Sequence, residues 1–307
     1  MTVTEPDKVK NMTQATVLGL GQLGSAVVAA MIAHGHPTTV WNRSTSRSAD
    51  IAARGALVAP DVVAAVQASR LVIVVVSDYA AVREVLHSAD NSLAGRTVVN
   101  LASGTPAQSR EMATWVIGHG ADYLDAAAMS GTELVGDPDA LFLFGGSRGA
   151  FADHKATLSA LGNAVHLGND PGLTSLYDTA LFGLACSTLA GFYHAVALAG
   201  SEGLAPPDMA RVAAAHLPFL SRLMTEHARQ IAESRYPSHD GTINVHATAM
   251  DHLVETSRQH GTALDVPEFL NGLLARALSH GHGESGIARV AEMFNGRVPA
   301  SDPWIAN

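Results

Sequence analysis

Three glycines in the pattern Gly-x-Gly-x-x-Gly follow an apolar run at 15–20 and precede a helix-like segment at 22–34. In that context the first glycine permits a tight turn, the second lets the backbone approach a pyrophosphate, and the third lets the helix pack on the strand. The amino end of the helix also attracts phosphate groups. The pattern predicts that a dinucleotide binds along Gly19, Leu20, Gly21, Gln22, Leu23 and Gly24. The alternative is that these glycines only turn the chain.

The residues after the second apolar run, 38–42, indicate which dinucleotide binds. An acidic residue there would bind the ribose 2′-hydroxyl of NAD, but the run leads into Asn42, Arg43, Ser44 and Arg47. The two arginines can form charged hydrogen bonds to a 2′-phosphate, and the Asn and Ser side chains can add neutral ones. We therefore expect NADPH/NADP as the cofactor, with two solvated arginines at a helix start as the alternative.

Two later apolar runs, 71–77 and 97–101, end in small or polar residues. Ligands of open α/β sheets bind beyond the carboxyl ends of the strands, so these strand ends should face the cofactor. The positions expected to contact it are Val76, Ser77, Asn100, Ala102 and Ser103. The Ser103 and Thr105 hydroxyls would lie near the nicotinamide or, equally well, either of them would cap the helix that begins at Pro106.

One acidic residue stands alone in a long helical segment, 172–204. Asp178 is the only Asp or Glu between positions 171 and 201, and it shares a helix face with Phe182 and Cys186. A carboxyl group on an apolar face is costly unless it is used or paired, and beside a basic nitrogen it could donate a proton or hold a positive charge. The alternative is a carboxylate bound to a backbone donor or an arginine, or one that serves the helix dipole.

The substrate should contact the residues around this carboxyl group and at the strand ends. The candidates are Ser103, Met129, Tyr177, Phe182 and Cys186. We interpret Cys186 as a small apolar side chain, because the sequence places no basic partner near it. The 15 histidines contain no His-Glu-x-x-His pattern, so we expect no metal site.

The elements that must position these residues follow two patterns. From 15 to about 165, continuous apolar runs alternate with helix-like stretches, as in parallel strands covered on both faces. After 168 the sequence predicts only helices, at 172–204, 208–233, 243–260, 267–281 and 285–294. The fold class is α/β: a Rossmann domain with a parallel sheet at 13–170, an interdomain helix at 171–204, and an all-α domain at 205–298.

Composition narrows the possible partners. The chain of 307 residues carries 19 Lys and Arg against 28 Asp and Glu, a net charge of -9 without any basic run, so nucleic acid is not an expected partner. Its single cysteine cannot form an intrachain disulfide. Residues 1–14 are polar and lack the apolar core of a signal peptide, which favours the cytoplasm.

The stretch 179–200 has no charged side chain and is long enough to cross a bilayer. It contains Thr, Ser, His and Gly, and no cluster of Lys or Arg flanks it, so we expect a helix buried between domains or subunits rather than a membrane partner. The chain beyond 204 also has no sheet of its own to pack on. Together these features predict an obligate homodimer.

Several segments jointly resemble the NADPH-dependent imine reductases and reductive aminases of the β-hydroxyacid dehydrogenase superfamily. They span nearly the whole chain, at 17–26, 40–44, 99–106, 124–131, 172–183 and 279–288. The resemblance implies hydride transfer from NADPH to the C=N bond of cyclic imines, which gives chiral amines. It also implies a domain-swapped dimer whose active sites lie between protomers.

The resemblance further implies that Asp178 is catalytic, because β-hydroxyacid dehydrogenases have a lysine at this place and many imine reductases have Asp. The chain has Cys186 where well-known reductive aminases have Tyr, and Ser103 where they have Asn. We therefore expect reduction of preformed cyclic imines, with reductive amination as the weaker activity. A β-hydroxyacid-type dehydrogenase and a non-enzymatic NADP-binding sensor are the alternatives.

Overall fold

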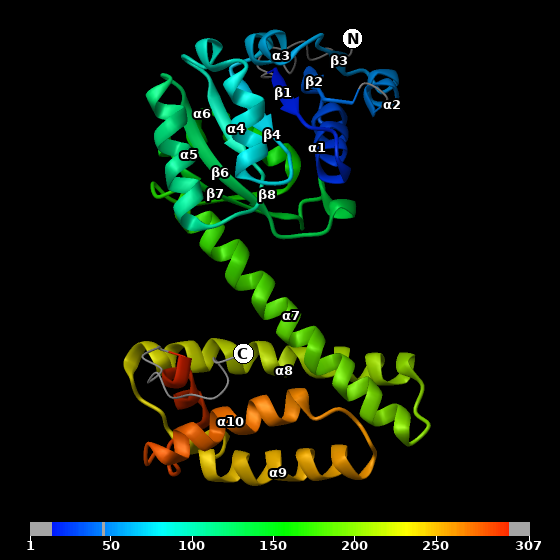
Figure 1. Cartoon of the computed structure of the whole chain (residues 1–307), viewed down its shortest axis with the longest axis vertical. Coiled ribbons are helices and arrows are strands. Elements are labelled where there is room, and N and C mark those ends of the chain that lie inside the picture. Colours follow the sequence, from blue (N-terminus) through cyan, green and yellow to red (C-terminus); the bar gives the residue numbers. More distant parts are fainter. Residues whose placement is uncertain (1–13, 45–46, 295–307) are drawn as a thin grey trace, which may run out of the picture. The chain divides into compact units, whose positions relative to one another are not determined.

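The computed structural model describes residues 14–44 and 47–294 (Figure 1). They form an open sheet with helices on both faces, followed by a set of helices without a sheet. The chain divides into two compact units between Gly183 and Leu184. We call these the sheet unit and the helical unit. The long helix α7, Gly172–Ser201, contributes to both.

The sheet has eight strands in the order β3-β2-β1-β4-β5-β6-β7-β8. The strands are β1 Ala15–Leu18, β2 Thr38–Trp41, β3 Leu57–Val58, β4 Leu71–Val74, β5 Thr97–Asn100, β6 Asp122–Ala128, β7 Leu141–Gly146 and β8 Asn163–Gly168. All neighbours are parallel except β6 and β7. The prediction of a parallel sheet is correct apart from this pair, which has no crossover helix between its strands and therefore runs antiparallel.

Alternate residues of the central strands enter two separate apolar cores, one on each face of the sheet. Val17 of β1 belongs to one core and its neighbour Leu18 to the other, which explains why the strands read as continuous apolar runs. Helices α1 and α6 cover the first core, and α3, α4 and α5 cover the second. The helices of this unit are α1 Gln22–Ala33, α2 Ser48–Ala53, α3 Val62–Ala68, α4 Tyr79–His87, α5 Pro106–Gly118 and α6 Arg148–Leu158.

The helical unit contains the end of α7 and the helices α8 Pro206–Glu233, α9 Ile243–Gln259 and α10 Asp265–Ser279. The expected helix at 285–294 is a 3-10 segment, Ile287–Phe294. Helices α9 and α10 pack around a small core of Ile243, Leu274 and Ala277. Between 172 and 294, the last residue described, no strand occurs, as the sequence predicts.

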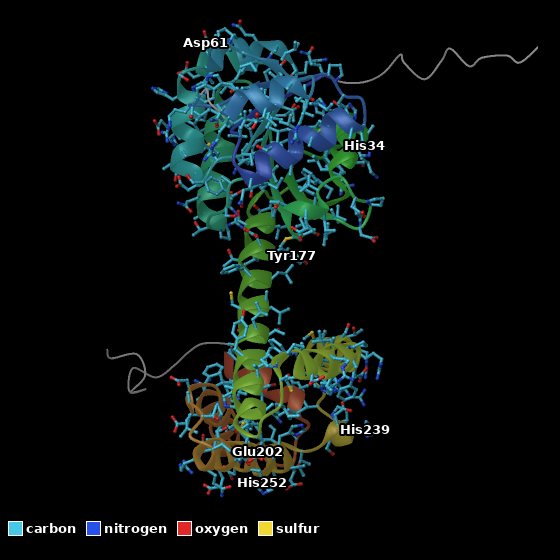
Figure 2. All side chains as sticks on the ribbon, turned by 90° about the vertical axis from the view of Figure 1, so that its right-hand side faces the viewer. His34, Asp61, Tyr177, Glu202, His239 and His252 are labelled. Atoms are coloured by element: carbon cyan, nitrogen blue, oxygen red, sulfur yellow. The ribbon has the colours of Figure 1, made fainter. Side chains whose placement is uncertain are left out.

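Polar side chains cap the first turns of α3 and α5. Asp61, which is labelled in Figure 2, caps α3. Its side chain accepts a hydrogen bond from the Ala64 amide. Thr105 forms a capping box with Gln108 at the start of α5, where Pro106 is the first helical residue. The cap of α5 is therefore Thr105 and not Ser103.

Candidate functional site

The glycine loop after β1 has the three geometries that the sequence predicts. Gly19 has φ +103°, and a Cβ atom there would collide with the Val75 carbonyl group. A Cβ atom on Gly24 would collide with the carbonyl oxygen of Gly19, so this glycine lets α1 pack tightly on the loop. Gly21 has open space within 4 Å of the Cβ position. The second glycine therefore leaves room for a phosphate group.

Helix α1 presents its amino end at the same loop. Its cap residue, Gly21, supplies no side-chain acceptor, so the first amides of the helix are available to a bound anion. Asn42 fixes the loop: its Oδ1 accepts a hydrogen bond from the Leu20 amide at 3.0 Å, and its Nδ2 donates to the Ser44 carbonyl oxygen at 2.8 Å. Arg47 reaches back to the Leu20 carbonyl oxygen at 3.5 Å.

A cavity of about 670 Å³ lies along this loop. Ten of the predicted cofactor residues line it: Gly19, Leu20, Gly21, Gln22, Leu23, Asn42, Arg43, Arg47, Val76 and Ser77. The sequence did not predict the remaining wall, which consists of Trp41, Val62, Val75, Ala81, Glu84, Val85 and Ser88. Trp41 could have been included, because it directly precedes Asn42 at the end of β2. Val75 could also have been included, because it lies between the end of β4 and Val76. The other five depend on how α3 and α4 approach the strand ends.

Five predicted cofactor residues do not line this cavity. They are Gly24, Ser44, Asn100, Ala102 and Ser103. Gly24 serves helix packing, as described above. Asn100 is fully buried, and its Oδ1 accepts a hydrogen bond from the Ala102 amide at 3.0 Å. Ser103 is exposed. A contact from Asn100, Ala102 or Ser103 to the nicotinamide end of the cofactor stays a prediction.

Asp125, on β6, is the centre of a buried polar cluster that sequence reasoning missed. Its Oδ1 accepts hydrogen bonds from the Tyr79 hydroxyl at 2.7 Å, the Tyr123 hydroxyl at 2.8 Å and the Asn100 amide at 3.0 Å. Its Oδ2 accepts one from the Ser175 hydroxyl at 2.9 Å. Burial raises the pKa of Asp125, although these four donors oppose the rise. Burial also raises the pKa of Tyr79.

An ion pair also holds the chain at the start of α7. Arg110 of α5 binds both carboxylate oxygens of Asp170, at 2.9 and 2.7 Å, and the same carboxylate accepts a hydrogen bond from the Gly172 amide at 2.9 Å. The Arg110 hydrogen bond holds the pKa of Asp170 below its usual value. A Cβ atom on Gly172 would lie 2.7 Å from the guanidinium carbon. Glycine at this position therefore makes room for Arg110.

Asp178 lies on the second turn of α7 and is half-buried. Throughout 14–44 and 47–294, no hydrogen bond or ion pair joins its carboxylate to another side chain. The paired alternative considered from sequence is thus not what the structure shows. Tyr177, which is labelled in Figure 2, is 48% exposed and Phe182 is 71% exposed within the single chain. The apolar face around Asp178 is open.

The other predicted substrate residues lie in separate surroundings. Met129 is half-buried directly after β6, and its amide donates to the Leu141 carbonyl oxygen at 2.9 Å. Cys186 is exposed on α7 in the helical unit. Among the described residues, no group of three His, Cys, Asp or Glu side chains is arranged to hold a metal ion.

The chain matches known proteins along almost its full length. Residues 14–168 match the family profile of the NAD binding domain of 6-phosphogluconate dehydrogenase, and residues 170–296 match that of the NADPH-dependent reductive aminase-like C-terminal domain. An NADPH-dependent reductive aminase of Aspergillus oryzae is 30% identical over 286 residues, which cover 91% of this chain and 96% of that protein. The chain belongs to the family of NADPH-dependent reductive aminases and imine reductases.

Solved structures agree with this assignment. A reductive aminase from Aspergillus terreus in complex with NADPH and ethyl levulinate is 33% identical to this chain, with a TM-score of 0.87. The match covers 92% of this chain and 100% of the aminase chain. An imine reductase from Myxococcus stipitatus in complex with NADP+ is 30% identical, with a TM-score of 0.85. That match covers 91% of this chain and 99% of the reductase chain. The fold class, the NADPH cofactor and an oxidoreductase acting on C=N bonds are thereby confirmed. These relatives favour imine reduction over a β-hydroxyacid-type dehydrogenase or a sensor.

Proposed function

We propose that this protein reduces the C=N bond of small hydrophobic cyclic imines, and that the Asp178 carboxyl group protonates the imine nitrogen or stabilises its positive charge. The observation that carries the proposal is the Asp178 carboxylate, which lies on an apolar face of α7 and has no hydrogen-bond or ion-pair partner within residues 14–44 and 47–294. A carboxyl group in that setting is matched to a basic nitrogen, because it can donate a proton or stabilise an iminium charge. The family's chemistry agrees with this role.

The residues around the 670 Å³ cavity fit NADPH. Gly21 leaves space for the pyrophosphate beside the free amides at the start of α1, and Arg43 and Arg47 line the same cavity where a 2′-phosphate would lie. When bound, NADPH supplies a hydride from its nicotinamide ring. The chain itself binds, orients and shields the reactants, and positioning of this kind can contribute a large part of the rate.

The residues proposed to line the substrate site favour a neutral, apolar substrate. Ser103, Met129, Tyr177, Phe182 and Cys186 include no Arg or Lys that would bind a substrate carboxylate. The small Cys186 side chain leaves room for a ring of five to seven atoms. Because the chain has Ser103 and Cys186 where well-known reductive aminases have Asn and Tyr, we propose that ketone and amine mixtures react more slowly than preformed imines.

We also propose that the active unit is a homodimer in the cytoplasm, with the helical units exchanged between protomers. Helix α7 is long and apolar enough to cross a membrane by length and composition alone, and only 6% of its most apolar window is buried within one chain. A second copy of the chain would cover its exposed apolar side chains, which include Leu184, Leu189 and Tyr193, each 46% or more exposed.

Isotope transfer tests the proposed reaction. NADPH that carries deuterium at the transferred position of its nicotinamide should place one deuterium on the former C=N carbon of the amine product. The nitrogen should instead take its hydrogen from water, through the group that protonates it. Deuterium on an alcohol carbon formed from a ketone, with none in any amine, would contradict the proposal.

A further inference from the structure

Two adjacent residues attach the first turn of α7 to the buried Asp125. The Ser175 hydroxyl donates to the Asp125 carboxylate at 2.9 Å and contacts the Tyr79 hydroxyl at 3.0 Å. The Thr174 hydroxyl donates to the Asp125 carbonyl oxygen at 3.3 Å. Thr174 is fully buried and Ser175 is 4% exposed, so water does not compete for these contacts.

These contacts define how α7 is set against the sheet. A Cβ atom on Gly145 of β7 would lie 2.6 Å from the Thr174 hydroxyl oxygen, so the helix approaches the strand closely here. Two side chains about 100° apart around the axis are fixed to the same residue of β6. Both the position of the helix along its axis and its rotation about that axis are therefore determined.

Asp178 follows Ser175 by three positions and Thr174 by four, which places all three on neighbouring rows of one helix. A helix is stiff over a single turn, so fixing Thr174 and Ser175 also fixes the direction of the Asp178 side chain. The Asp125 carboxylate binds Asn100 as well, whose Oδ1 holds the Ala102 amide. One carboxylate thus connects the start of α7 to the 100–103 loop at the carboxyl end of β5.

We propose that Asp125 is a positioning residue for imine reduction, which acts through Ser175 to fix the Asp178 carboxylate relative to the 100–103 loop. This inference rests on the proposed role of Asp178. It assigns Asp125 no contact with substrate or cofactor, because the side chain is 1% exposed and surrounded by its four donors. A displacement of about 1 Å at a reacting group can cost about 100-fold in rate. The loss of a positioning contact should therefore be measurable as a fall in rate.

The test variant is Ser175→Ala, which removes the hydrogen bond from α7 to the Asp125 carboxylate, keeps the Thr174 bond to the Asp125 carbonyl oxygen and leaves the sheet core unchanged. We expect kcat for a cyclic imine to fall about tenfold, with the KM for NADPH within about twofold of wild type, because α7 does not line the cofactor cavity. Ser69→Ala is the matched control. Ser69 is 6% exposed and its hydroxyl also makes two hydrogen bonds, to Thr16 and the Leu71 carbonyl oxygen, at the amino edge of the sheet.

Both variants lose a buried serine hydroxyl in the same unit, so their melting temperatures should fall by similar amounts. Only Ser175→Ala should lose kcat. Equal kcat values for the two variants would overturn the proposal, because the loss would then reflect stability alone.

A double-mutant cycle tests whether Ser175 acts through Asp178. In an Asp178→Ala background, Ser175→Ala should change kcat by less than about twofold, because the group that it positions is already gone. A further tenfold loss would overturn the inference and leave the proposed function intact. If Asp178→Ala alone retained wild-type kcat, the proposed role of Asp178 would fail, and the positioning role would fail with it.

Discussion

At the level of single residues, Arg43 and Arg47 carry the choice of cofactor. Both line the cavity at the end of β2, and Arg47 already lies over the glycine loop through its contact with the Leu20 carbonyl oxygen. Replacing both arginines with alanine should lower kcat/KM for NADPH at least about tenfold and leave kcat/KM for NADH nearly unchanged, because only NADPH offers a 2′-phosphate.

Steady-state kinetics with both cofactors measures this change. Arg54→Ala is the control, since Arg54 ends α2 and does not line the cavity. Equal losses for NADPH and NADH in the double variant would show that the arginines do not recognise the phosphate.

The Asp178 carboxylate is the residue on which the proposed chemistry depends. Asp178→Ala should lower kcat for a cyclic imine about 100-fold, the lower end of the contribution expected from general acid catalysis. NADPH binding, measured by the change in cofactor fluorescence, should stay within about twofold of wild type. Full activity of this variant on an imine would remove Asp178 from the mechanism.

At the level of elements, the sequence located most strands because residues such as Val17 and Leu18 face opposite cores and give an uninterrupted apolar signal. It did not locate β3, which has two exposed residues, or the antiparallel pairing of β7. Such features depend on neighbouring strands rather than on local pattern.

Some residues of the site belong to local sequence motifs, whereas others come together only in the tertiary structure. The glycine loop and the arginines are local motifs, so their place in the cavity could be predicted. The Asp125 cluster could not, because its partners Tyr79, Asn100 and Ser175 are 46, 25 and 50 positions away in the chain. Only the assembled fold brings these polar groups together, and the sequence of β6 gives no sign of the partners of Asp125.

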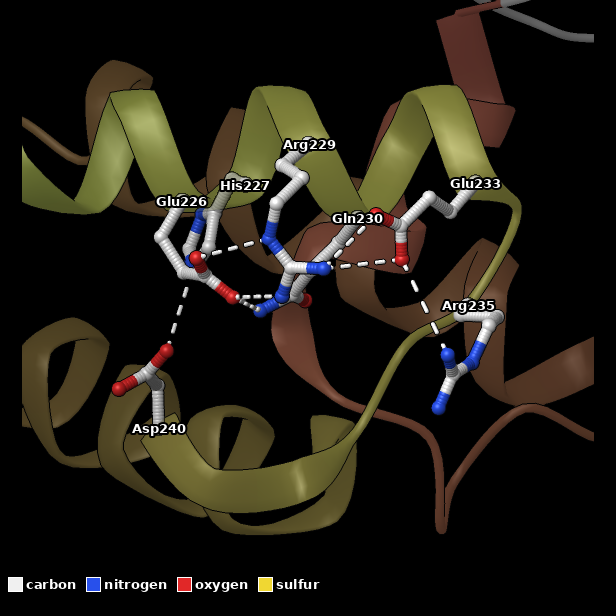
Figure 3. Close-up of polar contacts among 7 residues, drawn as sticks. All are labelled: Glu226, His227, Arg229, Gln230, Glu233, Arg235 and Asp240. Atoms are coloured by element: carbon white, nitrogen blue, oxygen red, sulfur yellow. Dashed lines mark hydrogen bonds and ion pairs between the residues drawn. The ribbon is translucent and has the colours of Figure 1, made fainter.

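A charged network on α8 gives the helical unit a pH dependence (Figure 3). Arg229 donates to Glu226 at 2.6 Å and to Glu233 at 2.8 Å, and Gln230 donates to Glu226 at 3.1 Å. The hydrogen bonds from Arg229 and then Gln230 lower the pKa of Glu226 from 4.5 to about 2. A lowered pKa in the folded state stabilises the protein above pH 4.5, and this contribution disappears as the pH falls towards 2.

Glu226→Gln should therefore lower the melting temperature slightly at pH 7, as expected for an exposed network, and the difference from wild type should shrink below pH 4.5. Thermal unfolding followed by circular dichroism across this range measures both values. Glu255→Gln, which removes one contact with Arg258 at 2.9 Å on α9, is the control and should have a smaller effect at pH 7. A difference that grows on acidification would contradict the assignment.

At the level of the whole molecule, the exposed apolar face of α7 predicts that the protein forms a homodimer. Leu189→Glu places a charge on this face, where Leu189 is 46% exposed in the single chain, and should convert dimers to monomers and lower activity. Leu57→Glu is the control, because Leu57 is 63% exposed on the edge strand β3 and its substitution should leave the dimer intact.

Sedimentation velocity at micromolar concentration distinguishes the two states. A folded, active wild-type monomer would contradict the proposed dimer. Recovery of the wild-type protein in the membrane fraction would show instead that lipid covers α7.

Initial rates of the wild-type enzyme, followed as the consumption or formation of NADPH, test the central claim most directly. One series should compare a five- to seven-membered cyclic imine, a 3-hydroxy acid with NADP+ in the reverse direction, and a ketone with equimolar amine. The account predicts that the cyclic imine has the highest kcat/KM, that the ketone and amine mixture is slower, and that NADH supports the imine reaction at least about tenfold less well. Faster turnover of the 3-hydroxy acid than of any imine would contradict it.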